Sequence, residues 1–362
     1  MKKMEKIVIV LVLLSVGSCE MLEKSKDPGT EYTETLRIGT WNVQTLFDGE
    51  ETGTEYAEYR SSAGWTDEKY RARLNAVAHA VNKLPEKTPD ILGLIEIENL
   101  QILEHLVQGP LAKQGYNWLF FGNNPGASLG IGVASRFPFE ETMVHSITSN
   151  GETTPRPILE IRLQIKGNLL ICLVCHWKSK AGGGDTESLR KASARVILRR
   201  LRELKQEAPD IPVIIMGDLN ENPDEFYRKA DSTLSALVPD DPSAVERTGS
   251  SAQMDFLILS QNKPPKPEYF GTEALVLYSP WEKELEEGSY YYKDEWEAID
   301  YFLLSDALFD QTGWDFDSCK VIKQEPFITN TKLPYRYDPK TGNGLSDHLP
   351  LILTLKQTKH VK

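Results

Sequence analysis

The clearest indication of the fold class is the stretch Pro212-Val213-Ile214-Ile215-Met216-Gly217-Asp218-Leu219-Asn220. Its first five residues are apolar and rich in β-branched side chains, which predicts a short buried strand. Asp218 and Asn220 follow directly at the carboxyl end of that strand. A rigid sheet holds the loops at its strand ends in place, and catalytic residues are concentrated on such loops. The stretch therefore predicts a sheet with a functional edge.

Five other apolar runs also have polar residues at one end. Three of them end in such a residue: Leu36–Trp41 before Asn42, Asp90–Ile95 before Glu96, and Asn168–Cys175 before His176. Two begin after one: Tyr301–Leu304 follows Asp300, and Leu349–Leu355 follows Asp347 and His348. In a mixed sheet, the ends of some strands and the beginnings of others meet at one edge. A single strand-end Asp or Asn is usually a turn residue, but six such clusters predict one shared site.

Segments with helical periodicity separate these runs. Apolar residues recur at intervals of three and four in Asp67–Leu84, Leu100–Leu111 and Thr186–Leu204. Further strands are expected at Trp118–Phe121, Gly130–Ser135, Ile158–Ile165 and Asp255–Leu259. This alternation of helices and strands predicts a layered α/β protein with two central sheets.

Residues 1–18 predict an export signal. Three lysines lie in the first six residues, and the apolar run Ile7–Val16 follows. As a helix this run would span about 15 Å, about half of a bilayer core, so it is too short for an ordinary membrane span. The ending Val16-Gly17-Ser18-Cys19 resembles a bacterial lipobox, which implies cleavage before Cys19 and diacylation of its thiol. The alternative is ordinary signal cleavage, with Cys19 incidental.

The remaining sequence predicts a polar tether over residues 19–35 and one large domain over residues 36–358. The full chain has a formal charge of −12. Loss of residues 1–18, which carry three lysines and one glutamate, takes that charge to −14. Such a protein does not attract polyanions at long range. Activity on nucleic acid would therefore depend on local basic residues and on divalent cations.

The cysteines do not predict a disulfide framework. Cys172 and Cys175 lie three residues apart in a strand-like run, so their side chains point to opposite faces and cannot hold one zinc ion together. They are expected to be buried packing residues.

Six blocks of the sequence resemble the endonuclease/exonuclease/phosphatase superfamily, which includes pancreatic deoxyribonuclease, inositol-phosphate phosphatases and bacterial sphingomyelinases. In chain order they are TWNVQTLFD, DILGLIEIEN, CHWKSK, GDLNENP, IDYFLLS and LSDHLPL, and they extend from Thr40 to Leu351. One block alone would be weak evidence, whereas all six in this order are specific. The resemblance implies a four-layer α/β sandwich, with helices flanking two central mixed or antiparallel β-sheets. WNVQTLFD and HWKSKAGGG are most similar to secreted bacterial nucleases.

The resemblance implies a divalent metal site. Its first ligand would be Glu96, and Asp347 and Asn42 would complete or orient the ligand shell. Mg²⁺ is the expected ion, because it binds a few carboxylate oxygens and keeps several waters. Mn²⁺ and Ca²⁺ are the alternatives.

The resemblance also implies a catalytic group. In the family, the residues corresponding to His348 and Asp300 contact the scissile phosphate, as a base or as an electrostatic clamp. Asp218, the competing candidate for the base, and Asn220 would position the attacking water. His176 would donate a hydrogen bond to phosphate or assist the leaving group.

Four further residues are candidates for substrate binding. Arg156, Lys178 and Lys180 could neutralise phosphate charge, although solvated surface cations are as frequent. Tyr290 could offer a stacking face for a base or sugar, or serve in packing.

Together these residues predict a Mg²⁺-dependent phosphodiester hydrolase, with DNA or RNA as its substrate. The lipid on Cys19 would anchor it to the membrane of the bacterial cell envelope, and no protein partner is implied. A phosphoesterase that acts on a lipid or inositol-phosphate headgroup would use the same site. A non-enzymatic binding lipoprotein is the third hypothesis, but it would not need this set of polar residues.

Overall fold

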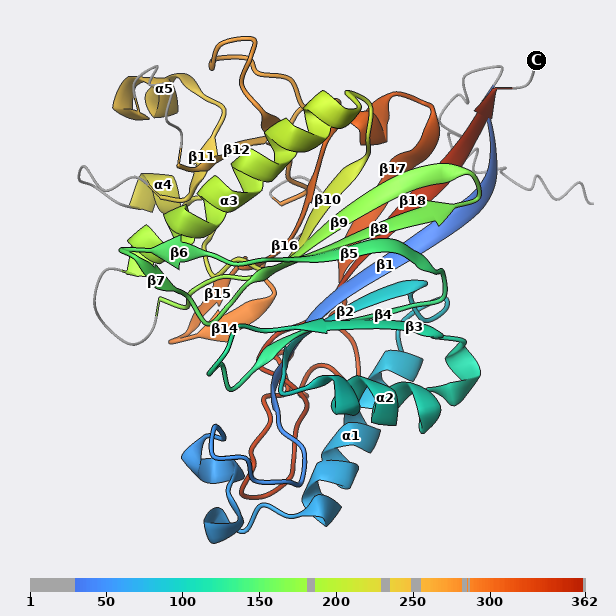
Figure 1. Ribbon diagram of the computed structural model, residues 1–362, viewed down its shortest axis with the longest axis vertical. Coiled ribbons are helices and arrows are strands. Elements are labelled where there is room, and N and C mark those ends of the chain that lie inside the picture. Colours follow the sequence, from blue (N-terminus) through green and yellow to red (C-terminus); the bar gives the residue numbers. More distant parts are fainter. Residues whose placement is uncertain are drawn as a thin grey trace, which may run out of the picture.

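The computed structural model of the chain describes residues 30–180, 186–228, 235–248, 255–281, 285 and 287–360. The predicted export signal and the lipidation of Cys19 lie outside these residues. Two large sheets pack face to face, with α3 on the outer side of one sheet and α1 and α2 on the outer side of the other (Figure 1). The four-layer α/β sandwich predicted from the sequence is therefore confirmed.

The first sheet has six strands in the order β17-β18-β1-β2-β4-β3. β1 lies between β2, to which it is parallel, and β18, to which it is antiparallel. It begins at Thr30, so residues 30–35 of the predicted tether belong to a strand. The elements of this half are β1 (Thr30–Leu46), α1 (Asp67–Asn82), β2 (Ile91–Ile97), α2 (Leu100–Gln108), β3 (Trp118–Gly122), β4 (Gly130–Ser135), β17 (Gly313–Val321) and β18 (Leu351–His360).

The second sheet has eight strands in the order β11-β12-β13-β16-β10-β9-β8-β5. It is also mixed, because β10 is parallel to β9 and antiparallel to β16. Its elements are β5 (Phe139–His145), β8 (Ile158–Ile165), β9 (Asn168–His176), α3 (Thr186–Glu207), β10 (Val213–Asp218), β11 (Leu237–Pro239), β12 (Leu257–Ser260), β13 (Val276–Tyr278) and β16 (Asp300–Leu304).

Short elements connect the layers. Two small hairpins, β6–β7 and β14–β15, project beside the large sheets (Figure 1). Among the residues that the structure describes, no helix is long and apolar enough to cross a membrane. The short elements are η1 (Ala57–Tyr59), η2 (Ser61–Ala63), η3 (Ala112–Gln114), β6 (Thr148–Ser149), β7 (Glu152–Thr153), α4 (Glu225–Arg228), α5 (Pro242–Thr248), β14 (Tyr290–Tyr292), β15 (Glu295–Glu297) and η4 (Asp306–Phe309).

The main hydrophobic core fills the space between the two sheets and extends into the layer between the second sheet and α3. In the first sheet, alternate residues of a strand face it, as the period of two in a strand requires, whereas β9, β10 and β16 of the second sheet contribute residues from both faces. On β1, for example, Leu36 and Ile38 belong to this core, whereas Trp41 and Val43 pack on the side of α1 and α2. Cys172 and Cys175 are free and buried in the main core, as predicted.

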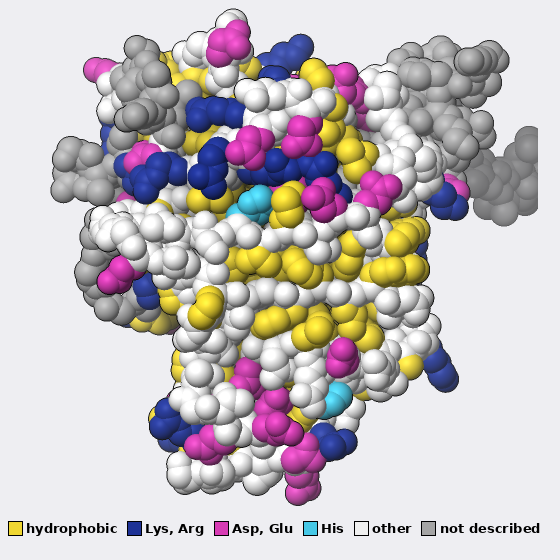
Figure 2. All heavy atoms as spheres, viewed as in Figure 1, with side chains coloured by type: hydrophobic (Ala, Val, Ile, Leu, Met, Phe, Trp, Pro, Cys, Tyr) yellow, Lys and Arg dark blue, Asp and Glu magenta, His cyan; other side chains and the backbone are white. Residues whose placement is uncertain are grey.

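A network of charged side chains ties α3 to the second sheet. Figure 2 shows this face, on which basic and acidic side chains are interleaved. The carboxylate of Glu160 on β8 is fully buried, and it accepts hydrogen bonds from Arg200 at 2.7 and 2.9 Å and from Arg162 at 3.2 Å. Burial alone would raise the pKa of Glu160, but hydrogen bonds from His145 and Arg200 lower it to about 2. The ionised carboxylate therefore stabilises the fold.

We predict that Glu160→Gln lowers the free energy of unfolding by about 3 kcal/mol at pH 7, because it removes the fully buried counter-charge of Arg162 and Arg200 and leaves these guanidinium groups with more exposed carboxylates as partners. The folded pKa of Glu160 lies below the unfolded value of 4.5. The stabilisation is therefore present above pH 4.5 and is lost as the pH falls towards 2, so the two proteins should converge there. Urea unfolding at pH 7 and in acid measures this. Glu203→Gln, at a half-exposed partner of Arg200, should cost under about 1 kcal/mol, and an equal loss in both variants would contradict the prediction.

Candidate active site

Three neighbouring strands of the second sheet bring three of the predicted site residues side by side. Asp218 at the end of β10 is paired with His176 on β9 and with Asp300 on β16. Gly217 makes this register possible, since a Cβ atom there would lie 2.1 Å from the carbonyl oxygen of Cys175 and its φ is +125°. The strand pairing alone therefore places an imidazole and two carboxylates in one row.

The first sheet contributes Asn42 and Glu96 from the ends of two adjacent strands. Asn42 on β1 is paired with Ile95 on β2. Glu96 has a left-handed backbone, with φ of 67°, and the pairing of β2 with β4 shifts register around it. A bulge of this kind redirects a side chain that would otherwise point to the opposite face. The carboxylate of Glu96 can thereby reach the space between the sheets.

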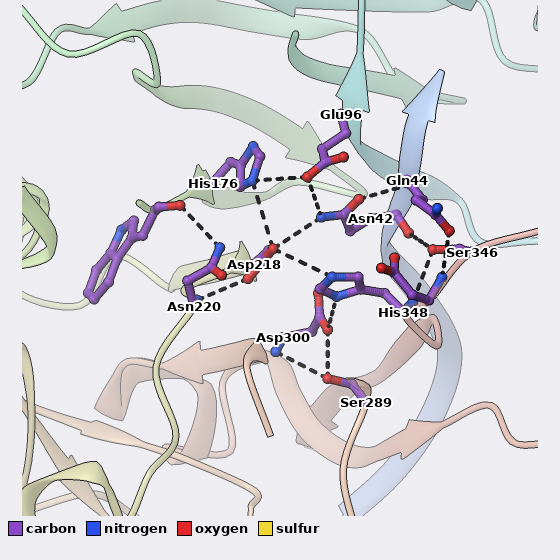
Figure 3. Close-up of polar contacts among 12 residues, drawn as sticks. Asn42, Gln44, Glu96, His176, Asp218, Asn220, Ser289, Asp300, Ser346 and His348 are labelled. Carbon is purple, nitrogen blue, oxygen red and sulfur yellow. Dashed lines mark hydrogen bonds and ion pairs between the residues drawn. The ribbon is translucent and has the colours of Figure 1, made fainter. Parts of the chain in front are cut away.

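The side-chain amide of Asn42 joins the two halves of the site (Figure 3). Its Nδ2 donates to Glu96 Oε1 at 3.2 Å and to Asp218 Oδ2 at 3.1 Å. Its Oδ1 accepts from the backbone N–H of Gln44 at 2.9 Å. In this geometry Asn42 orients two carboxylates rather than offering an oxygen to a cation.

His348 and Asp300 form a buried pair on the other side of Asp218. His348 Nδ1 lies 2.8 Å from Asp300 Oδ2, and its Nε2 faces Asp218 Oδ2 at 4.0 Å. Ser289 Oγ also donates to Asp300 Oδ2, at 2.6 Å. Burial alone would lower the pKa of His348, but the charge and hydrogen bond of Asp300 raise it to about 10. The imidazole is therefore protonated at neutral pH, with Nε2–H directed into the site.

The pKa values of Asp218 and His176 are shifted toward the uncharged forms, whereas that of His348 is shifted toward its charged form. Burial, together with the nearby charges of Asp300 and Glu96, raises the pKa of Asp218 to about 7, although the positive charge of His348 and the hydrogen bond from Asn42 oppose the increase. Burial, with the positive charges of Arg156 and His348, holds the pKa of His176 well below its usual value. At neutral pH Asp218 can thus exchange a proton, and His176 is a neutral imidazole.

Asn220 is fixed beside Asp218. Its backbone N–H donates to Asp218 Oδ1 at 2.9 Å and its Nδ2 donates to the carbonyl of Trp177 at 3.1 Å. Its φ of 52° is another left-handed backbone at a non-glycine residue, a conformation that is concentrated at functional sites.

One cavity of about 880 Å³ is lined by Glu96, His176, Asp218, Asn220 and His348. Three of the four predicted substrate-binding residues, Arg156, Lys180 and Tyr290, line it together with Asp347. Lys180 is already ion-paired with Glu225 at 2.9 Å. Lys178 lines a neighbouring cavity instead.

The residues around the cavity fit a divalent cation. Glu96 Oε1 lies 3.5 Å from His176 Nε2, Glu96 keeps partial exposure to the cavity, and Asp347 lines the same space. The ligand atoms of Asp218, Asp300 and His348 also lie within 4.8 Å of one another. However, His348 Nδ1 and Asp300 are engaged with each other, so we favour Glu96 as the main ligand. Burial is the main cause of the raised pKa of Asp218, and the charges of Asp300 and Glu96, which a cation would offset, contribute to it.

Sequence reasoning missed several residues that position the site. Ser289 holds Asp300, Ser346 Oγ donates to the carbonyl of Asn42 at 2.6 Å, and Gln44 Oε1 accepts from the backbone of Asp347 at 3.0 Å. Serine and glutamine carry no periodic signal, and their partners are far away in the sequence. Tyr56, which also lines the cavity, lies in a segment at residues 48–58 that is rich in acidic residues.

The chain is similar to a known protein family and to several solved structures. Residues 37–246 match the model of the endonuclease/exonuclease/phosphatase family. A solved endonuclease/exonuclease/phosphatase from Bacteroides vulgatus has 14% identity and a TM-score of 0.50, covering 90% of this chain and 100% of its own. Humanized D. rerio TDP2 has 16% identity and a TM-score of 0.48, over 89% and 98% of the two chains. The human Nocturnin catalytic domain with bound sulfate has 17% identity and a TM-score of 0.47, over 90% and 96%. No curated protein matches the chain.

We predict that Mg²⁺ stabilises the protein against thermal unfolding and that Glu96→Gln abolishes this effect. A ligand at a hundred times its dissociation constant adds about 2.7 kcal/mol to the free energy of unfolding. Glu58→Gln makes the same chemical change at the exposed mouth of the cavity and should retain most of the effect. Calorimetry with Mg²⁺, Mn²⁺ and Ca²⁺ measures binding directly. Equal affinity in the wild type and in Glu96→Gln would exclude Glu96 as a ligand.

Proposed function

The chain belongs to the endonuclease/exonuclease/phosphatase family, and on that premise we propose that it is a nuclease that hydrolyses phosphodiester bonds of DNA or RNA with a bound Mg²⁺. The observation that supports this most directly is the convergence of Glu96, Asp218 and the Asp300–His348 pair on one cavity. Family members with this fold are divalent-metal-dependent hydrolases of phosphodiester bonds.

Each residue of the cavity has a role that its geometry suits. A divalent ion held by Glu96, with Asp347 nearby, would neutralise charge on the phosphate and on the departing oxygen. His348, protonated through its pairing with Asp300, directs Nε2–H toward the centre of the site and would donate it to a phosphate oxygen. The neutral His176 would donate a second hydrogen bond on the opposite side.

Asp218 is the best candidate for the general base. Its pKa of about 7 lets the carboxylate accept a proton from water at neutral pH, whereas an imidazole with a pKa of about 10 would hold its own proton. Asn42 and Asn220 fix both of its oxygens, through Oδ2 and Oδ1 respectively. This assignment leaves His348 as the electrostatic clamp.

Aromatic rings favour nucleic acid as the substrate. Tyr290 packs on His348 with ring centroids 4.6 Å apart, and Tyr292 stacks on Tyr290 at 6.1 Å. Tyr292 is 46% exposed, so a series of ring faces extends from the site to solvent. Base stacking on such rings tolerates any sequence.

A phosphoesterase that acts on a lipid or inositol-phosphate headgroup is the runner-up, because it would use the same cavity. The β14–β15 hairpin beside the site turns at Lys293 and Asp294. A charged tip does not suit insertion into a bilayer, which requires apolar side chains. This observation ranks the lipid substrate second.

We predict that the protein cleaves oligonucleotides in Mg²⁺, that EDTA abolishes cleavage, and that His348→Ala lowers the rate by about 10²- to 10⁴-fold. A panel of duplex DNA, single strands, RNA, sphingomyelin vesicles and inositol phosphates measures the substrate class. His79→Ala replaces an exposed histidine on α1 and is the matched control.

Cleavage of sphingomyelin or inositol phosphates without cleavage of nucleic acid would favour the runner-up. Full activity in EDTA would refute the role of the metal. A His348→Ala rate within a few-fold of the wild type would refute the role of His348.

We also propose that the chain is exported and anchored to the bacterial cell envelope by a lipid on Cys19. Cells grown with labelled palmitate should incorporate the label into the wild type and not into Cys19→Ala, because the thiol of Cys19 is the group that receives the lipid. Immunoprecipitation of the two proteins measures this. Equal labelling of both proteins, or none in the wild type, would contradict the lipid anchor.

A further inference from the structure

A second cavity of about 310 Å³ adjoins the catalytic one, and none of the roles assigned above uses it. Tyr56, Arg156 and His176 line both cavities, so the two spaces share a wall. Leu129, Leu189 and Pro155 give the second cavity an apolar side, and Lys178 lies at its border. Its volume is within the range of small-molecule sites.

Lys178 and Arg156 are cations without an acidic partner. No hydrogen bond or ion pair joins the Lys178 ammonium group to any residue that the structure describes. Arg156 donates to the carbonyl of Trp177, and within the described part of the chain no carboxylate lies at ion-pair distance from it. Burial, Arg156 and Arg190 together lower the pKa of Lys178. Positive charge is therefore concentrated here in a protein whose formal charge is −12.

Two neighbouring cations do have acidic partners. Lys180 is paired with Glu225, and Arg190 with Glu187 and Glu221. The basic residues on the face shown in Figure 2 likewise alternate with acidic ones. Arg156 and Lys178 therefore form a positively charged site near His176 that suits an anionic ligand from outside the protein.

Tyr56 presents an aromatic face at the boundary of the two cavities. Tyr56 is 41% exposed, and it packs against another aromatic side chain. It contacts Phe47 at 5.3 Å, Phe47 contacts Tyr59 at 4.8 Å, and Tyr59 contacts Trp65 at 4.9 Å. These three anchoring rings are buried. These buried rings on either side of residues 48–58 therefore hold Tyr56 in a fixed position.

We propose that the second cavity is a subsite for the nucleotide next to the scissile bond, in which Lys178 binds that nucleotide's phosphate and Tyr56 stacks on its base. This inference rests on the proposed function, and it narrows the substrate to a strand with at least two phosphates. The base must be unpaired to lie on the tyrosine ring, so the strand is single-stranded at this position. A headgroup with one phosphodiester would leave the subsite empty.

The test compares two substrates and uses Lys178→Met, which removes the charge but keeps the length of the side chain. Bis(p-nitrophenyl) phosphate has one phosphate, whereas a short single-stranded oligonucleotide has phosphates on both sides of each bond. Lys178→Met should raise KM for the oligonucleotide about tenfold, the loss of one charge-assisted hydrogen bond. The kcat/KM for bis(p-nitrophenyl) phosphate should fall far less than the kcat/KM for the oligonucleotide. Lys113→Met, at an exposed lysine on η3, should match the wild type.

A binding measurement separates the subsite from the activity. In EDTA, a fluorescein-labelled oligonucleotide should bind Lys178→Met about tenfold more weakly than the wild type. The slope of the logarithm of the binding constant against the logarithm of the salt concentration should also be less steep by about 0.7, the value for one phosphate of a single strand. Tyr56→Leu should weaken binding about tenfold, and Tyr56→Phe should restore it, because the ring provides the stacking.

Equal losses on both substrates would overturn the proposal, since Lys178 would then act at the scissile phosphate or on the fold. Unchanged oligonucleotide binding in Lys178→Met or in Tyr56→Leu would also overturn it. A wild type that hydrolyses no oligonucleotide yet shows the expected differences in binding would refute the nuclease activity and leave the subsite supported.

Discussion

The arrangement of the site depends on one buried amide, the side chain of Asn42, which lies between carboxylates from the two sheets. Its Nδ2 donates to both Glu96 and Asp218 and so relieves part of their mutual repulsion. The orientation of the amide is fixed in turn, because Oδ1 accepts from Gln44 and the backbone carbonyl accepts from Ser346. Two sheets joined mainly by apolar packing could slide relative to each other, whereas a polar bridge at their edge sets one relative position.

Strand pairing explains why part of this site could be predicted from the sequence. The runs that end in His176 and Asp218 and the run that begins at Asp300 are recognisable from their composition, and the ladder then aligns them. Glu96 was found by its position and family resemblance, but the bulge that turns it into the site has no sequence signal. Ser289 and Gln44 could not be found, because each acts through a partner that only the tertiary fold brings near.

The bounds of the helices and strands were likewise predictable only in part. α1 and α2 begin at the predicted residues, because their capping residues Thr66 and Asn99 accept hydrogen bonds from the first turn. β1 extends to Thr30 because β18 continues alongside it, and this long-range pairing cannot be seen in a polar stretch. β5 and β17 were not predicted, since their outer faces are polar and their apolar alternation is weak.

The negative and the positive side chains at the site have different roles. A carboxylate cluster is required to hold a cation, yet the same cluster repels a phosphate, and a net charge of −12 adds to that repulsion. Protonated His348 acts within the cluster, where Asp300 keeps it charged. Arg156 and Lys178 act at the border, where no described carboxylate neutralises them. If the chain acts on a polyanion as proposed, these two cations would favour a path for the substrate along the side of the cavity formed by Tyr56 and His176.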